Sequence, residues 1–423
     1  MRTLVLNAGS TSLKASLIEE PGDVTVARGT ADWDGTDAAS AVGSLLSRLG
    51  DVAPDAVGHR VVHGGSRFVA PTRFDSALLA SLTELADLAP LHNPPAVAVL
   101  RAALSRWPDV PQVACFDTAF HTALPAAARI YPLPWSWYEE WGMRRYGFHG
   151  LSVEWSLARA GELLGRPADE LGLVVAHLGG GCSVTAVAAG RSVDTSMGYT
   201  PLEGLMMGTR AGSVDPGILL EVLADRDVSL PDLTDVLLHR SGLLAIGGSS
   251  AARELESRAA TGDERAALAL EMFTRRAGAG IAAAATALPQ IDALIFTGGI
   301  GEHSGLLRSA ITPGSARSGS SHCRSPRLTQ TGSCRVARRA SRCCGSRRAR
   351  IWSSPARRRH CSPEPIARGA IHPGLKCRGA PGSPVVYAPT ASNRPGTTDS
   401  PSNSGGLRVL VHKQPQSDEL SCK

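Results

Sequence analysis

Apolar residues in the first 313 positions follow two alternating periods, one typical of strands and one typical of helices. The apolar run Leu4, Val5 and Leu6 predicts a short buried strand, and residues 15–19 predict a second strand that completes a hairpin. This alternation continues along the chain and indicates an α/β fold, in which ligands usually bind at the ends of strands. Further strands are predicted at 56–63, 111–116 and 173–176, helices at 38–49, 76–88, 96–105 and 152–164, and a rigid loop at 89–95.

Three of the predicted strands run into glycine-rich turns, which contain Gly9, residues 179–181 and residues 298–301. Glycine permits positive φ, so several backbone N–H groups can point into one concavity that suits a phosphate. A strand, a glycine turn and a second strand recur at 173–184, and this repetition hints at an internally duplicated fold. The three turns together favour a nucleotide-binding cleft between two domains.

The first turn carries additional polar groups. Ser10, Thr11 and Ser12 supply hydroxyl donors and Lys14 supplies a positive charge, so this stretch can cradle a phosphate although it lacks the Walker A spacing. A β-hairpin with a polar turn explains the same residues. Both interpretations remain open from this stretch alone.

The two ends of the chain differ in charge. Residues 314–423 contain 20 of the 44 Lys and Arg side chains but only 4 of the 38 Asp and Glu side chains. The first 313 residues are therefore acidic, and the positive charge of the whole chain does not indicate nucleic-acid binding. Of the 9 cysteines only Cys115 and Cys182 lie in the acidic part, which indicates a reducing compartment without structural disulfides.

The apolar segments are too short or too interrupted for targeting or membrane insertion. The N-terminal apolar run spans only Leu4 to Leu6, which is too short for a signal peptide. Residues 277–296 form the longest apolar segment, but Pro289 and Asp292 interrupt it, so it predicts a helix followed by a strand. We therefore expect a cytoplasmic protein that binds neither a membrane nor nucleic acid.

Four motifs resemble, in order and spacing, those of the acetate kinase family over about residues 1–310. They are Asn7-Ala8-Gly9-Ser10-Thr11-Ser12-Leu13-Lys14, Phe116-Asp117-Thr118-Ala119-Phe120-His121, His177-Leu178-Gly179-Gly180-Gly181 and Thr297-Gly298-Gly299-Ile300-Gly301-Glu302. The shorter motifs Leu91-His92-Asn93-Pro94-Pro95 and Gly208-Thr209-Arg210 favour the acetate branch. The resemblance implies two ribonuclease H-like domains, 1–149 and 150–313, of the acetate and sugar kinase/Hsp70/actin fold around a central cleft, and a homodimer.

This resemblance implies Mg²⁺- or Mn²⁺-dependent transfer of a phosphoryl group from ATP to acetate, giving acetyl phosphate and ADP by direct in-line transfer. Such a transfer needs charge neutralisation and positioning, and arginine binds planar anions through two N–H groups at once. By resemblance, Arg60 holds acetate and Arg210 stabilises the transferring phosphoryl group. Exposed salt bridges are the alternative for both arginines.

Two further side chains are expected to contribute to catalysis. Asp117 follows a predicted strand and can hold the metal or orient acetate, which needs no general base because it is already ionised at neutral pH. Its alternative role is to cap a helix that begins at Thr118. By resemblance, His149 donates to a phosphoryl oxygen in the transition state, although a histidine satisfied within the core is also possible. His92 matches another active-site histidine of the family, and Asn7 is the candidate residue on the metal side.

The resemblance also implies an apolar pocket for the acetate methyl group. Such a pocket separates acids that differ by one methylene by only about 1–3 kcal/mol, so propionate should react as well, although less efficiently. The matching residues are Val62, Leu91, Phe148 and Pro201.

The nucleotide-binding positions implied by the resemblance lie in four segments. They are Ser10, Ser12, Lys14, His177, Leu178, Gly179, Gly180, Gly181, Ala251, Ala252, Arg253, Gly299, Ile300, Gly301, Glu302 and His303. Three of them depart from the family pattern: Gly180 and His303 each replace an asparagine, and Ala251 replaces an aspartate near the adenosine. These departures concern the choice of phosphoryl donor, so a donor other than ATP is an alternative, as is an inactive relic that binds nucleotide.

The resemblance ends near Pro313. The family continues to a second metal-binding glutamate, which is not found here, whereas residues 314–423 are rich in Arg, Ser, Pro, Gly and Cys, which predicts disorder. A reading-frame shift explains this composition, and a basic nucleic-acid-binding arm and a Cys/His metal site are the alternatives. Residues 407–411 can form a strand and Glu419 can replace the missing glutamate, but the sequence decides neither.

Overall fold

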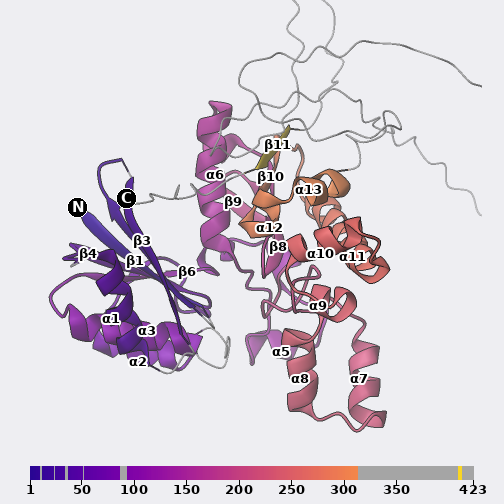
Figure 1. Ribbon diagram of the computed structural model, residues 1–423, viewed down its shortest axis with the longest axis horizontal. Coiled ribbons are helices and arrows are strands. Elements are labelled where there is room, and N and C mark those ends of the chain that lie inside the picture. The colour runs from indigo at the N-terminus through magenta and orange to yellow at the C-terminus, as the bar shows by residue number, and fades with distance from the viewer. Residues whose placement is uncertain are drawn as a thin grey trace, which may run out of the picture.

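The computed structural model describes most of the acidic part of the chain and one short segment beyond it. The described residues are 1–9, 12–22, 24–33, 37–50, 52–85, 93–312 and 408–411. They form two α/β units, each built on one sheet (Figure 1). Among the residues singled out from the sequence, Ser10, Thr11, Leu91, His92 and Glu419 lie outside these ranges.

The first unit contains a sheet with the strand order β3-β2-β1-β4-β6-β5. The predicted hairpin is confirmed, because β1 and β2 pair in antiparallel fashion from Arg2 with Glu19 to Ala8 with Leu13. β1 is parallel to β4, and β4 is parallel to β6, so the carboxyl ends of these three strands lie at one edge of the sheet. The strands are β1 (Arg2–Ala8), β2 (Ser12–Glu19), β3 (Val24–Asp32), β4 (Ala56–Val61), β5 (Thr72–Arg73) and β6 (Gln112–Phe116).

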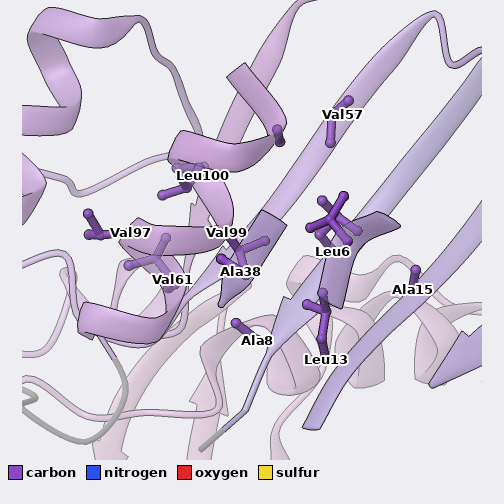
Figure 2. Packing of buried hydrophobic residues seen from close by; sticks show 14 of the residues in the cluster. Leu6, Ala8, Leu13, Ala15, Ala38, Val57, Val61, Val97, Val99 and Leu100 are labelled. Atoms are coloured by element: carbon purple, nitrogen blue, oxygen red, sulfur yellow. The ribbon is translucent and has the colours of Figure 1, made fainter. Parts of the chain in front are cut away.

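Helices α1 (Ala38–Leu49), α2 (Ser76–Thr83) and α3 (Asn93–Arg106) pack on this sheet. Leu6 and Leu13 of the sheet and Leu100 of α3 belong to one core of buried side chains, part of which Figure 2 shows. Helix α1 has the predicted bounds, but the helix predicted at 76–88 ends at Thr83. The prediction that the next helix begins at residue 96 is wrong, since Pro94 and Pro95 occupy its first turn, where a missing N–H is tolerated.

Short elements and one long helix connect the two units. α6 begins directly at Gly150, two residues before the predicted start at residue 152, and it ends as predicted. A Cβ atom at Gly150 would lie 2.3 Å from the carbonyl oxygen of Asp117, so only glycine lets α6 begin this close to the first sheet. These elements are η2 (Ala119–His121), α4 (Ala126–Arg129), α5 (Trp135–Glu139), α6 (Gly150–Leu164) and η3 (Ala168–Glu170).

The second unit contains a sheet with the strand order β11-β10-β7-β8-β9. Its central strand β7 is buried at every position except His177, as expected for a strand covered on both faces. Val174 and Ala176 join the core beneath α11, whereas Leu173 and Val175 join the core beneath α6, because successive side chains point to opposite faces. The strands are β7 (Leu173–Leu178), β8 (Cys182–Ala188), β9 (Arg191–Thr195), β10 (Ala293–Thr297) and β11 (Arg408–Val411).

Seven helices belong to the second unit. The predicted helix followed by a strand at 277–296 is confirmed as the end of α11 and the strand β10, and no helix in the described ranges is long and apolar enough to span a membrane. Helices α7 and α8 project from the rest of the unit as a pair (Figure 1). The helices are α7 (Pro216–Asp225), α8 (Leu230–His239), α9 (Gly242–Gly247), α10 (Ala252–Ala260), α11 (Glu264–Ala285), α12 (Gly298–His303) and α13 (Gly305–Ile311).

The two sheets share one topology, which confirms the internal duplication expected from the sequence. In each, three consecutive antiparallel strands are followed by a parallel strand beside the first of them, β4 beside β1 and β10 beside β7. A second parallel strand then follows, β6 in the first unit and β11 in the second.

Strand β11 corrects one expectation from the sequence. Residues 408–411, within the tail expected to be disordered, pair in parallel with β10, from Ala293 with Arg408 to Phe296 with Val411. Val409 and Val411 are β-branched and favour a strand, and β10 offers the sheet edge with which they pair. The other predictions for residues 313–407 and 412–423 lie outside the described residues.

Candidate active site

The carboxyl ends of β1, β4 and β6 bring three predicted site residues together. Arg60 donates from Nε to both carboxylate oxygens of Asp117 at 3.1 Å, and from Nη2 to Oδ2 at 2.5 Å. Its Nη1 donates to Oδ1 of Asn7 at 3.1 Å. The Asp117 side chain is only 3% exposed, whereas 30% of the Arg60 side chain remains accessible to a ligand. The charge of Asp117 raises the pKa of Arg60, which keeps the guanidinium cationic.

The structure does not support the alternative roles considered for Asp117 and Arg60. Asp117 does not cap the following helix, because Thr118 occupies the cap position of η2 without a side-chain hydrogen bond, and the Asp117 carboxylate pairs with Arg60. The Arg60–Asp117 pair is partly buried, so it is not the exposed salt bridge considered for Arg60.

His149 lies immediately before α6 in a left-handed conformation with φ of 61°. Its Nδ1 forms a hydrogen bond of 2.9 Å with the Ser183 hydroxyl on β8, and its ring stacks on His177 with centroids 4.0 Å apart. Burial lowers the pKa of His149 well below its usual value, and the nearby charges of Arg60 and Arg210 lower it further. The imidazole is therefore neutral at physiological pH.

Arg210 approaches the same imidazole from the second unit. A Cβ atom built on Gly181 would lie 3.2 Å from Nε2 of His149 and 3.7 Å from Nη1 of Arg210, so this glycine lies between the two side chains. Arg210 also donates from Nη1 to the carbonyl of Pro201 at 3.3 Å. Arg60 of the first unit and Arg210 of the second unit both lower the pKa of this one histidine.

The residues expected to receive the acyl group are mostly buried. Val62 and Phe148 are 4% and 1% exposed and belong to one apolar cluster, although Val62 follows β4 of the first unit and Phe148 precedes α6. Pro201 contacts Arg210 instead, because its backbone carbonyl accepts a hydrogen bond from the Arg210 guanidinium.

The first glycine turn belongs to the first unit, and the second and third turns belong to the second unit. In the first turn, the Gly9 N–H donates to the Ser12 carbonyl at 2.8 Å and closes the hairpin of β1 and β2, and Lys14 is exposed on β2, so a hairpin and a phosphate-binding turn are compatible here. The second and third turns are neighbours, because a Cβ atom on Gly179 would lie 3.7 Å from the N atom of Gly299. The expected nucleotide residues 177–181 and 299–303 therefore lie together.

Within these turns, His177 and Glu302 already have partners in the protein. His177 forms a hydrogen bond of 3.0 Å between Nδ1 and the Ser152 hydroxyl, and burial lowers its pKa to about 4. Glu302 is 7% exposed, and its Oε1 accepts a hydrogen bond of 3.1 Å from the Gly298 N–H. The Glu302 carboxylate thus stabilises the backbone of the third glycine turn.

The departures from the family pattern lie at the open side of this region. Gly180 is exposed, and no heavy atom lies within 4 Å of a Cβ atom built on it. Ala251 occupies the N-cap position of α10 and forms no side-chain hydrogen bond there. On the same helix Ala252 is 6% exposed and Arg253 is exposed. His303 is exposed at the end of α12. Gly208 lies between the Gly180 turn and the segment before α10. A Cβ atom built on it would lie 3.8 Å from the Gly180 carbonyl oxygen and 3.4 Å from the Ser250 carbonyl oxygen.

Three residues without a predicted role support the site. Ser183 binds His149, and His121 binds the backbone of Phe148. Asn93 clamps the backbone of His63, accepting from its N–H at 3.2 Å and donating to its carbonyl at 3.0 Å. His121 and Asn93 belong to motifs quoted above, so their presence in those motifs was the available signal. Ser183 follows the second glycine turn and gave no signal of its own.

The donor groups near Arg60 fit a hard cation such as Mg²⁺. Mg²⁺ keeps several waters and takes one or two carboxylates together with substrate phosphates, and Asn7 and Asp117 offer one amide and one carboxylate side by side. Within the described ranges, no group of three or more His, Cys, Asp or Glu side chains is placed to hold a metal. The protein would thus supply few of the ligands.

Comparisons with known proteins agree with this geometry. The profile of the Acetokinase family matches residues 47–320. The chain is 45% identical to the acetate kinase of Deinococcus deserti over 73% of this chain and 84% of that protein. The crystal structure of the Porphyromonas gingivalis acetate kinase matches with a TM-score of 0.68 and 35% identity, over 73% of this chain and 86% of that one.

A propionate kinase is similar to the same extent. The structure from Francisella tularensis has a TM-score of 0.66 and 35% identity, again over 73% of this chain and 86% of that one. These likenesses, together with the duplicated sheets, confirm the acetate and sugar kinase/Hsp70/actin fold. The chain belongs to the acetokinase family.

Proposed function

We propose that this chain transfers a phosphoryl group from ATP to acetate, giving acetyl phosphate and ADP. One observation carries the proposal: the neutral side chain of His149 and the guanidinium of Arg210 approach the same glycine, Gly181, and the charge of Arg60 from β4 also acts on His149. Phosphoryl transfer between two anions requires cationic groups on both sides of the moving group. This arrangement supplies them.

Arg60 is the proposed acetate-binding residue. Asp117 engages Nε and Nη2 of its guanidinium, and Asn7 engages Nη1, so the planar group is fixed before substrate arrives. A fixed guanidinium loses little side-chain entropy when it binds a carboxylate. Asp117 therefore contributes by holding Arg60 in place.

His149 is the proposed donor to the transferring phosphoryl group. If the Ser183 hydroxyl donates to Nδ1 of His149, the proton of the neutral ring resides on Nε2, the atom nearest Gly181 and Arg210. His149 then donates a hydrogen bond without adding charge, and Arg210 supplies the charge that stabilises the equatorial oxygens. We propose His92 as a further catalytic residue on the resemblance alone.

The two adjacent glycine turns form the proposed nucleotide side. We assign residues 177–181, 251–253 and 299–303 to the nucleotide, and by the family resemblance we also assign Ser10, Ser12 and Lys14 to its phosphates. Asn7 and Asp117 would hold Mg²⁺ or Mn²⁺. When bound, this cation neutralises charge on the phosphates of ATP.

Propionate is the proposed second substrate. Val62 and Phe148 present a closely packed apolar surface, to which we add Leu91 and Pro201, and the fold matches a propionate kinase as well as an acetate kinase. One methylene changes binding in an apolar pocket by about 1–3 kcal/mol. We expect propionate to react with a lower kcat/KM than acetate.

Three coarser properties complete the proposal. We place the domain boundary at 149/150, where α6 begins, and we propose a homodimer. Cys115 and Cys182 are both unpaired among the described cysteines, in keeping with the reducing cytoplasm.

Replacing either arginine tests the proposal. We expect Arg60→Ala and Arg210→Ala to lower the rate of acetyl phosphate formation at least about a hundredfold, because each removes a charge from the transition state. Hydroxamate trapping with acetate, ATP and Mg²⁺ measures the product. Arg67→Ala is the matched control, since Arg67 pairs with Glu84 on the surface and its side chain is 57% exposed. Normal turnover in both active-site variants would refute the assignment.

A further inference from the structure

His121 is a buried side chain next to Phe148, a residue of the expected acyl pocket, and has no assigned role of its own. It is the last residue of η2, and 2% of its surface is exposed. Its Nε2 lies 2.9 Å from the carbonyl oxygen of Phe148, and its Nδ1 lies 2.9 Å from the hydroxyl of Ser192 on β9. The ring thus connects the end of the first unit, the segment before α6 and the second sheet.

Chemistry fixes the direction of both hydrogen bonds. A carbonyl oxygen can only accept, so Nε2 of His121 carries the proton and donates to Phe148. Burial lowers the pKa of His121 to about 4, so the ring is neutral and Nδ1 accepts from the Ser192 hydroxyl. His121 is therefore held in one tautomer and one orientation.

The carbonyl that His121 binds belongs to the peptide between Phe148 and His149. The residues on either side of Phe148 have left-handed backbones, with φ of 73° at Gly147 and 61° at His149. A left-handed conformation is unfavourable for a non-glycine residue, so His149 needs neighbours that hold it there. A Cβ atom on Gly147 would lie 2.6 Å from Cγ of His121, which shows how closely this segment packs on the imidazole.

We propose that His121 is a positioning residue for phosphoryl transfer. It fixes the peptide between Phe148 and His149, and it thereby directs the Phe148 ring to the acyl group and the His149 ring to the phosphoryl group. This inference rests on the proposed function. It predicts that losing the hydrogen bond to the Phe148 carbonyl lowers kcat while the KM for ATP is preserved.

Two substitutions at His121 separate its two hydrogen bonds. In His121→Gln, the side-chain amide can reach the Nε2 position and still donate to the Phe148 carbonyl. In His121→Asn, the shorter amide can reach only the Nδ1 position and contact Ser192. We expect His121→Asn to lower kcat about tenfold to a hundredfold with the KM for ATP within about twofold, and His121→Gln to recover most of the kcat.

The rates are referred to folded protein, measured by circular dichroism, so that loss of stability does not count as loss of catalysis. Full kcat in His121→Asn, or equal loss in both variants, would overturn the positioning role. The ¹⁵N signals of the His149 imidazole, identified with His149→Gln, give a readout that does not depend on activity. They should shift in His121→Asn and stay near wild type in His121→Gln; the reverse would overturn the inference. A wild type that makes no acetyl phosphate would overturn the proposed function instead.

Discussion

At the scale of single residues, the site combines charged arginines with buried histidines that are neutral. Arg60 is kept charged by Asp117, whereas His149 and His177 are kept neutral by burial. A neutral histidine between two arginines adds no repulsion of its own. The charges needed for transfer therefore come from guanidinium groups, which stay protonated at all physiological pH values.

Gly180 provides a prediction about the nucleotide. The resemblance implies an asparagine at this position, and the structure leaves open space for its side chain. We expect Gly180→Asn to lower the KM for ATP about tenfold to a hundredfold, because one hydrogen bond to a charged phosphate contributes about 1.5–3 kcal/mol. Steady-state kinetics with ATP varied measure the effect. Gly43→Asn, at an exposed and equally open position on α1, is the control. An unchanged or raised KM for ATP in Gly180→Asn would contradict the prediction.

Buried histidines predict how stability depends on pH. Burial lowers the pKa of His59, His63, His121 and His177 to about 4 from the usual value of 6.5. Between these values the unfolded chain binds protons that the folded chain excludes, so the free energy of unfolding falls as the pH falls. Each histidine contributes about 1.4 kcal/mol per pH unit in this window. Urea unfolding at pH 7 and pH 5 measures the loss.

Two variants check the origin of this loss. His59→Gln removes one buried histidine away from the site and should reduce the loss between pH 7 and pH 5. Ser47→Ala, on the exposed side of α1, removes no ionisable group and should leave the loss unchanged. Equal pH dependence in wild type and His59→Gln would contradict the explanation.

At the scale of elements, the strands and their glycine turns could be predicted, and the partners of their polar residues could not. The hairpin of β1 and β2 and the strand–turn–strand at β7 and β8 follow from local apolar runs and nearby glycines. Arg60 and Asp117, in contrast, are 57 residues apart, and their pairing depends on the parallel alignment of β4 and β6. No local pattern reports such an alignment.

Helices without a motif were also missed. The region of α7 to α10 contains no recognised motif ahead of Ala251, and α7 has no buried residue that would give it an apolar stripe facing a core. The start of α3 was misplaced because two consecutive prolines suggest a loop, although the first turn of a helix accepts them. His121 was seen only as part of a motif, since its bond to Phe148 depends on the tertiary fold.

Strand β11 gives a prediction at this scale. Its pairing covers the edge of β10, so deletion of residues 408–411 should remove several backbone hydrogen bonds, each with a net contribution of about 0.5–1.5 kcal/mol. We expect a lower midpoint of thermal unfolding, measured by circular dichroism. Deletion of residues 418–421, outside the described ranges, is the control. If both deletions leave the midpoint unchanged, the pairing does not contribute to stability.

At the scale of the whole molecule, duplication explains where the site lies. Each unit places its site residues at the carboxyl ends of parallel strands. Arg60 is near the end of β4 and Asp117 follows β6, and the glycine turns follow β7 and β10. We therefore propose that acceptor and donor bind to different halves of this repeated fold. We further propose that the composition of residues 314–423 arises from a reading-frame shift after about Pro313, because the family profile ends at residue 320.

The projecting pair of helices α7 and α8 gives a prediction about assembly. Ile218, Leu220 and Leu230 are 56%, 68% and 66% exposed, and we propose that a second copy of the chain covers them (Figure 1). We expect wild type to sediment as a dimer and Leu220→Glu as a monomer, because a charge in an apolar interface is costly. Leu268→Glu, at a 49% exposed position on α11, is the control. A dimeric Leu220→Glu variant or a monomeric wild type would contradict this interface.

The central claim is that this 423-residue chain phosphorylates acetate. The most direct test is to purify the full chain and to measure acetyl phosphate by hydroxamate trapping, with acetate, ATP and Mg²⁺ each omitted in turn. We predict product that requires all three components, with less product from propionate than from acetate at equal concentration. A folded chain that forms no acetyl phosphate, or forms it equally well without ATP, would contradict the account.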